Sequence, residues 1–236
     1  MTEPVVVARR EPGDPPRWGL GDAVAGYLVA FTLVSLAGSA WVGVTGDDES
    51  LGLLVTVMAA QWVGLLGAVI LASRRKGTGR LAHDFGLRVE PRDIGIGLTA
   101  GVLSQFVLVP LLYLPLRLVD DDLDLSEKAR ELTDLAHGWT VVILVVLVVV
   151  GAPLVEELFY RGLLLRSLSR RFGPGWGVAG SAVAFGVVHF QPLQLLGLIA
   201  FGVVLAVLAE RSGRLGPSLM AHIAFNASTV VLLRLL

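Results

Sequence analysis

The chain has 236 residues, of which 54% are hydrophobic and only 17% are charged, and it contains no cysteine. Soluble domains of this size carry about 25% charged residues, so this chain lacks the polar surface that a water-soluble protein needs. The missing cysteines exclude disulfides, thiolate zinc sites and cysteine nucleophiles. The net charge of −1 gives no support to a nucleic-acid partner.

Seven stretches with few or no charges follow one another along the chain. About 20 helical residues cross the hydrocarbon core of a bilayer, and most of the stretches have this length. We therefore predict an all-α fold, a polytopic helical bundle with about seven transmembrane helices that has the lipid bilayer as its surroundings. The stretches cover residues 20–44, 51–72, 94–116, 139–155, 176–190, 193–209 and 215–233.

The fourth stretch is short for a spanning helix, but its helical pattern continues beyond residue 155. The pattern runs through the segment EELFYRGLLLRSLSRRF. The sequence Gly151-Ala152-Pro153 is expected to kink the helix, because proline cannot donate a backbone hydrogen bond. We predict one long, kinked helix from Trp139 to about Arg171.

The charges of the connecting segments alternate along the chain. Of the 19 Lys and Arg residues, 14 lie before the first stretch, between the second and third, at the end of the long fourth helix from Arg166 onwards, or just before the seventh. The acidic runs 47–49 and 120–122 lie in the intervening segments. Positive charge marks the cytoplasmic side of a membrane, so we expect a cytoplasmic N-terminus and a C-terminus outside.

Three regions follow from this pattern. Residues 1–18 form a polar cytoplasmic tail, in which no apolar core follows the first arginines, so a cleaved signal is not expected. Residues 19–138 form a transmembrane scaffold with a connector at 74–92 and an acidic external loop at 120–138. A helical turn is expected in this loop around Ser126 to Leu135. Residues 139–236 form the predicted catalytic domain.

Apart from Asp22, which can lie at the membrane interface near the start of the first stretch, the charged and histidine side chains of the predicted membrane helices cluster in this last region. Each costs at least a few kcal/mol in a bilayer, so a function is the first hypothesis for it. Glu157 and Arg161 lie four residues apart on one helix face and can form an ion pair. Glu156 is rotated by about 100° in a regular helix and is expected to face elsewhere.

Two further polar pairs each share a face of their own helix: Phe185 with His189, and His222 with Asn226. At the helical rise, Glu156, His189 and His222 lie about 12 to 16 Å from the predicted cytoplasmic ends of their helices. This common depth indicates a single site near the cytoplasmic leaflet.

The side chains of this site are sufficient to hydrolyse an amide. Glu156 can act as the general base that takes a proton from water. His189 and His222 can orient that water, polarise the carbonyl group or protonate the leaving amine. Asn226 can donate a hydrogen bond to the developing oxyanion. Glu157 and Arg161 would then hold the helix in place.

Two alternatives remain open at this point. Glu156, His189 and His222 also form a set of two histidines and one carboxylate, which is a catalytic zinc pattern, and Glu157 would then have to be the base. No H-E-x-x-H motif accompanies it. The same pocket could instead serve a non-proteolytic membrane protein, either a proton-coupled transporter or a peptide-binding immunity or scaffold protein.

The motifs Glu156-Glu157-x-x-x-Arg161, Phe185-x-x-x-His189 and His222-x-x-x-Asn226 resemble those of the CPBP or Abi family of intramembrane peptidases. This family includes type II CAAX prenyl endopeptidases and bacteriocin-processing and self-immunity proteins. The segment Asp84-Phe85-Gly86-Leu87-Arg88 is similar to a connector of bacterial members.

The resemblance implies an integral-membrane endopeptidase, in a bacterial cytoplasmic membrane, that acts on a membrane-associated peptide or protein. It does not imply that this substrate is prenylated. The catalytic residues that it implies are Glu156, His189, His222 and Asn226, with Glu157, Arg161 and Phe185 in support.

Overall fold

The computed structural model describes residues 16–118, 124 and 126–235, and these residues form helices and no strands. One continuous helix runs from Thr140 to Phe172, and its α-helical and π-helical (η) stretches have separate labels. The helices are α1 (Leu20–Thr45), α2 (Leu51–Lys76), α3 (Leu81–Phe85), α4 (Pro91–Leu103), η1 (Ser104–Leu108), α5 (Val109–Arg117), α6 (Glu127–Asp134), α7 (Thr140–Val145), η2 (Val146–Gly151), α8 (Ala152–Glu156), η3 (Glu157–Leu165), α9 (Arg166–Phe172), α10 (Pro174–Val187), α11 (Leu195–Ser212) and α12 (Gly216–Leu235).

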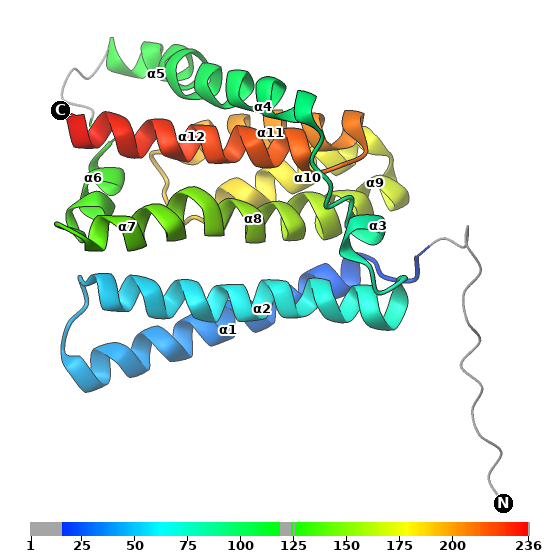
Figure 1. The fold of residues 1–236 in the computed structure, drawn as a ribbon, viewed down its shortest axis with the longest axis horizontal. Coiled ribbons are helices and arrows are strands. Elements are labelled where there is room, and N and C mark those ends of the chain that lie inside the picture. Colours follow the sequence, from blue (N-terminus) through cyan, green and yellow to red (C-terminus); the bar gives the residue numbers. More distant parts are fainter. Residues whose placement is uncertain (1–15, 119–123, 125, 236) are drawn as a thin grey trace, which may run out of the picture.

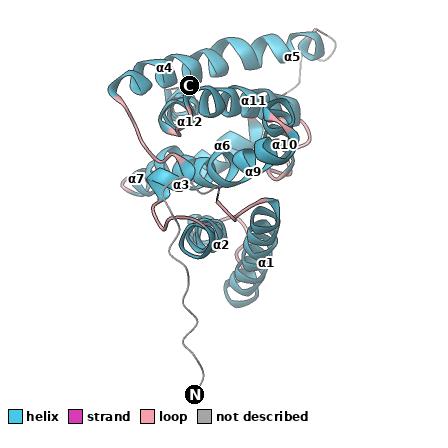
Figure 2. Cartoon of the chain, turned by 90° about the vertical axis from the view of Figure 1, so that its right-hand side faces the viewer, coloured by secondary structure: helices cyan, strands magenta, loops and turns pink. Residues whose placement is uncertain are grey.

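The helices pack in tiers around the long α7–α9 helix (Figures 1 and 2). The α1–α2 hairpin lies on one side of it, α10, α11 and α12 lie on the other, and the α4–α5 helix covers α12 from outside. Many apolar side chains face outward, as a lipid-facing surface requires. The predicted all-α polytopic membrane bundle is confirmed.

The predicted count of about seven spanning helices is wrong. Within the described residues, six helices are long and apolar enough to cross a membrane. The missing one is α10, which has 14 residues and is therefore about 21 Å long, against a hydrocarbon core of about 30 Å. The helix ends at Val187, and the chain turns at Phe190, whose φ is 51°. This turn shortens the predicted stretch 176–190.

The long fourth helix is continuous, as predicted, and π-helical stretches lie on either side of the short α8 segment that contains Pro153. The π-helical stretches are η2 and η3. In a π-helical turn the carbonyl of Val148 would accept from residue 153, which is a proline without an N–H. Asn226 on α12 donates its Nδ2 to this carbonyl at 2.8 Å. The carbonyl that the irregular turn leaves without a backbone partner thus connects the long helix to α12.

The connector 74–92 and the acidic loop both contain short helices. In the connector, Asp84 accepts hydrogen bonds from the Ser73 hydroxyl at 2.5 Å and from the Thr78 backbone at 3.0 Å. Burial alone would raise the pKa of Asp84, but these bonds, together with the field of His83, lower it. In the acidic loop, α6 forms where a helical turn was expected.

An ion pair and a line of small residues hold α4 against α12. Arg214, just before α12, binds the buried Asp93 through two hydrogen bonds, Nε–Oδ2 at 2.8 Å and Nη2–Oδ1 at 2.5 Å. Further along α4, Gly97 and Gly101 pack directly against the α12 backbone. A Cβ atom built on Gly101 would lie 2.2 Å from the carbonyl oxygen of Ala221. The two helices approach this closely only because glycine has no side chain.

We predict that Gly101→Ala lowers the free energy of unfolding by about 1–3 kcal/mol, because the new methyl group meets backbone that cannot move aside. Gly95→Ala is the matched control, since nothing lies within 4 Å of its Cβ position. It should be neutral or stabilising, by up to about 1 kcal/mol. Denaturant unfolding in micelles, followed by circular dichroism, measures both. Equal stability of the two variants would contradict the close packing.

Candidate active site

The residues of the three sequence motifs meet around His222, which is buried within α12. Its Nδ1 lies 3.2 Å from Oε1 of Glu157, and its Nε2 lies 3.8 Å from Oε2 of Glu156. The position of Glu156 in a regular α-helix predicted that its side chain faces away from Glu157. This prediction is wrong, because both side chains approach His222. The helix changes from α to π geometry between the two glutamates, and both carboxylates approach the same imidazole ring.

The predicted ion pair between Glu157 and Arg161 is present and fully buried. Arg161 Nη1 lies 3.1 Å from Glu157 Oε1, and the two side chains are 0% and 1% exposed. Arg161 Nη2 also donates to the carbonyl of Gly202 at 3.2 Å, and its guanidinium lies 4.4 Å above the centre of the Phe185 ring. Glu157 thus contacts a cation on its own helix and an imidazole on α12.

Phe185 lies between the two histidines and contacts both. Its ring centre is 4.8 Å from that of His189 and 5.5 Å from that of His222. His189 Nδ1 lies 2.6 Å from the backbone carbonyl of Phe185. A carbonyl can only accept, so Nδ1 carries the proton of this bond. In the neutral ring, His189 Nε2 is then the free acceptor.

A cavity of about 310 Å³ contains these groups. It is lined by Glu156, Phe185, His189, His222 and Asn226, so the structure brings together all four predicted catalytic residues and one of the supporting ones. Glu157 and Arg161 lie outside its lining and contact it through His222 and Phe185. The predicted distinction between catalytic and supporting residues stays a prediction.

The cavity extends from His222 toward α6. Lys128, Ala129 and Thr133 of α6 line it, together with Gln191 of the α10–α11 turn. These residues were not among those predicted for the site. The only signal was in α6, where Ala129 and Leu132 alternate with charged side chains and so give the helix an apolar face.

The described residues do not form the metal site that the sequence left open. No group of three or more His, Asp and Glu side chains within residues 16–118, 124 and 126–235 could hold a metal ion. The Nδ1 atoms of His189 and His222 contact Phe185 and Glu157, so Nε2 is the nitrogen that each ring presents to the cavity. Because Glu156, His189 and His222 are not gathered into a metal-binding group in the described residues, the chemistry is derived from the side chains themselves.

The fold and the site define an all-α, polytopic membrane protein with an acid–imidazole cluster in a cavity between its helices. Residues 138–228, which include all three motifs, match the sequence model of the family described as "Type II CAAX prenyl endopeptidase Rce1-like". The "Putative membrane peptidase YdiL" of Bacillus subtilis (strain 168) is 27% identical over 107 residues. These findings confirm the resemblance to the CPBP family of membrane peptidases.

The similarity is confined to part of each protein. The aligned residues make up 45% of this chain and 43% of the Bacillus protein, so the chain spans less than half the length of that relative. No solved structure matches the chain.

We predict that Arg161→Met lowers the free energy of unfolding by about 3–5 kcal/mol, because Glu157 is left as an unpaired buried charge. Adding Glu157→Gln to the same chain should restore part of this loss, since paired groups couple by about 0.5–3 kcal/mol. Arg171→Met, at an exposed position on α9, should change stability by no more than about 0.5 kcal/mol. Denaturant titration of the wild type, Arg161→Met, Glu157→Gln, the double variant and Arg171→Met measures the coupling, and simple additivity of the two changes would refute it.

Proposed function

We propose that this protein is an intramembrane endopeptidase that hydrolyses a peptide bond of a membrane-associated peptide or protein with a glutamate-activated water. One observation carries the proposal: Glu156, His189 and His222 line one cavity, and His222 lies between two adjacent carboxylates. A general base beside an imidazole that a second carboxylate orients is an arrangement suited to acyl transfer. The family match supports a membrane peptidase in general.

In the first step, Glu156 takes a proton from a water molecule as the water oxygen attacks the carbonyl carbon of the substrate. His189 Nε2 accepts the second hydrogen bond of this water and so directs its lone pair toward the substrate. The product is a tetrahedral intermediate with a negative oxygen. The N–H of Asn226 that does not bind Val148, and the Nε2–H of a protonated His222, can stabilise this oxygen.

In the second step, the carbon–nitrogen bond breaks and the proton held by Glu156 passes to the leaving amine. The products are a new carboxyl terminus and a new amino terminus, and Glu156 is again a carboxylate. Glu157 fixes the ring orientation of His222 and stabilises its charged form, as an orienting carboxylate does beside a catalytic histidine. Arg161 and Phe185 hold these two groups in place.

We further propose the orientation and domain division that the sequence indicated. Arg17 donates its backbone N–H to the carbonyl of Lys76, and Arg166 donates to the carbonyl of Gly213, next to Arg214. Arg170 on the helix of Arg166 also binds Trp18, so these basic residues gather at one end of the bundle, which supports a cytoplasmic location for that end. The segment from residue 139 onwards supplies all seven motif residues, with residues 19–138 as a scaffold. In this orientation the cavity extends toward the outer face, so the substrate would reach Glu156 past α6.

We expect Glu156→Gln to abolish peptide cleavage while the protein stays folded, because the amide cannot accept the proton of the attacking water. Purified protein in proteoliposomes would be tested on fluorogenic membrane-anchored peptides, with and without a prenyl group. Glu131→Gln, on an exposed side chain of α6, is the matched control and should keep full activity. Wild-type activity in Glu156→Gln would exclude the proposed mechanism.

The same preparation separates the glutamate mechanism from a metal mechanism. We expect activity to persist after chelation and metal analysis to show less than one equivalent of bound zinc. Loss of activity on chelation, with recovery on adding zinc, would overturn the glutamate mechanism. Proton or peptide flux without any cleavage would instead identify the transporter that the sequence left as an alternative.

A further inference from the structure

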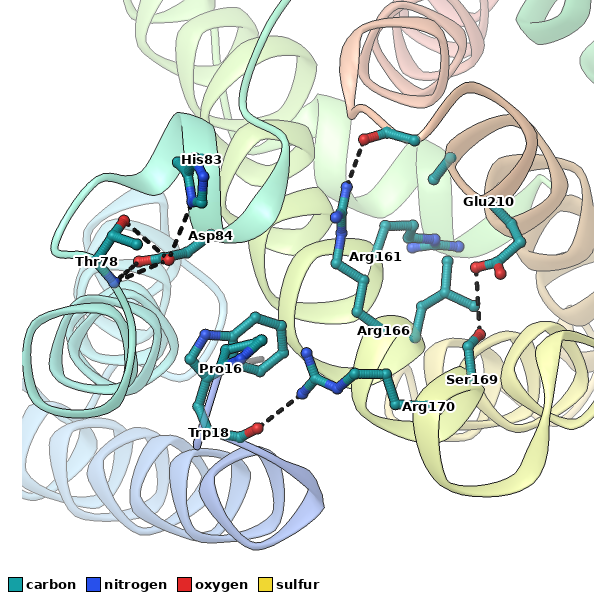
Figure 3. A pocket seen from close by; sticks show the side chains of 13 residues that line it. Pro16, Trp18, Thr78, His83, Asp84, Arg161, Arg166, Ser169, Arg170 and Glu210 are labelled. Carbon is teal, nitrogen blue, oxygen red and sulfur yellow. Dashed lines mark hydrogen bonds and ion pairs between the residues drawn. The ribbon is translucent and has the colours of Figure 1, made fainter. Parts of the chain in front are cut away.

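A second cavity lies at the basic end of the bundle, away from the proposed active site. It has a volume of about 400 Å³ and lies between the start of the described chain, the α2–α3 connector, α9 and the α11–α12 turn. Figure 3 shows Arg161, Arg166 and Arg170 on one side of this cavity and Trp18 across from them. Nothing in the proposed reaction uses this space.

Two of the three arginines that line the cavity form no contact ion pair, although Glu210 lies close enough to Arg166 to act on it electrostatically. Within the described part of the chain, neither Arg166 nor Arg170 forms an ion pair with Asp or Glu. Arg166 Nη2 donates to the carbonyl of Gly213 at 2.8 Å, and Arg170 Nη2 donates to that of Trp18 at 2.7 Å. Arg170 also stacks 3.8 Å from the centre of the indole ring. Both guanidinium groups are thus fixed in position and keep further N–H donors.

The acidic side chains that line the cavity are already engaged. Asp84 accepts hydrogen bonds from Ser73 and from the backbone and hydroxyl of Thr78. Glu210 accepts a hydrogen bond from the Ser169 hydroxyl at 3.2 Å. Once Arg161 is paired with Glu157, the lining contains two arginines, Arg166 and Arg170, and two carboxylates that already accept hydrogen bonds from other groups. Arg166 is half-buried and Arg170 is exposed, and neither forms an ion pair, so their remaining N–H groups can bind an anion that enters the cavity.

We propose that this cavity binds a phosphate group through Arg166 and Arg170. Guanidinium groups bind phosphate oxygens in a two-pronged geometry that a single ammonium group cannot match. The phosphate could belong to the headgroup of an anionic phospholipid or to a soluble phosphate compound, and both have the same recognition chemistry. Basic pockets between membrane helices on the cytoplasmic side are typical sites for such headgroups.

The surroundings of the cavity fit a ligand at the membrane boundary. Phe172, at the end of α9, and Trp176, in the first turn of α10, are 51% and 73% exposed. Aromatic side chains at such positions lie at the level of the lipid headgroups. A phosphate bound here would link the segment at Trp18 to α9, so binding should stabilise the folded protein.

The test measures binding to the purified full-length protein in a neutral detergent. Short-chain phosphatidylglycerol, short-chain phosphatidylcholine and inorganic phosphate are added separately, and thermal unfolding and native mass spectrometry report binding. Arg166→Gln and Arg170→Gln are compared with Arg171→Gln, which changes an exposed neighbouring arginine outside the cavity lining. We expect phosphatidylglycerol to raise the unfolding temperature of the wild type. Its affinity should fall at least tenfold in the two cavity variants and less than twofold in Arg171→Gln.

Binding of inorganic phosphate that depends on the same two arginines would identify a soluble ligand, and binding of phosphatidylglycerol alone would identify a lipid headgroup. Either result supports the site. Equal binding of phosphatidylglycerol and phosphatidylcholine, or an equal loss in Arg171→Gln, would overturn it. Because Arg170 also holds Trp18, Arg166→Gln and Arg166→Lys decide the question if Arg170→Gln does not fold. The lysine variant should bind more strongly than the glutamine variant, since it keeps the charge.

Discussion

One carboxylate oxygen connects the two halves of the proposed site. Glu157 Oε1 lies 3.1 Å from Arg161 on its own helix and 3.2 Å from His222 on α12. All three side chains are buried, so none of them can exchange its partner for water without a large free-energy cost. This double contact fixes the ring of His222, and the ring in turn presents its other nitrogen to Glu156. Further contacts hold the helix of Glu157 and α12 at the distance that this double contact requires.

Two kinds of contact hold α12 in place. On the outer side, Gly97 and Gly101 of α4 allow backbone contact, and the Asp93–Arg214 ion pair fixes the level at which α12 begins. On the inner side, the π-helical turn before Pro153 exposes a carbonyl that Asn226 binds. Small residues and satisfied backbone groups are the usual means of helix association in lipid, where burial of apolar surface gives no driving force. Asn226 thus has a structural contact as well as its proposed catalytic one.

The sequence alone was sufficient for the fold class, the long fourth helix, the pair of Glu157 and Arg161, and the meeting of the motif residues around one cavity. These depend on local periodicity and on the cost of charge in a membrane, both of which can be read along the chain. The direction of Glu156 could not be predicted, because it depends on a change from α to π geometry. The length of α10 depends on a turn at Phe190, and the role of α6 in the cavity wall depends on tertiary packing, for which the sequence gives no period.

The two cavities approach the same buried ion pair from opposite ends of the bundle. Arg161 lines the cavity at the basic end, while its partner Glu157 contacts His222, which lines the other cavity. A continuous path between them would require Arg161 to leave Glu157, and separating a buried pair costs several kcal/mol. In the structure described here the pair therefore closes the protein between its two ends. In the proposed hydrolysis, the pair would form the closed end of the cavity that holds the peptide bond beside Glu156.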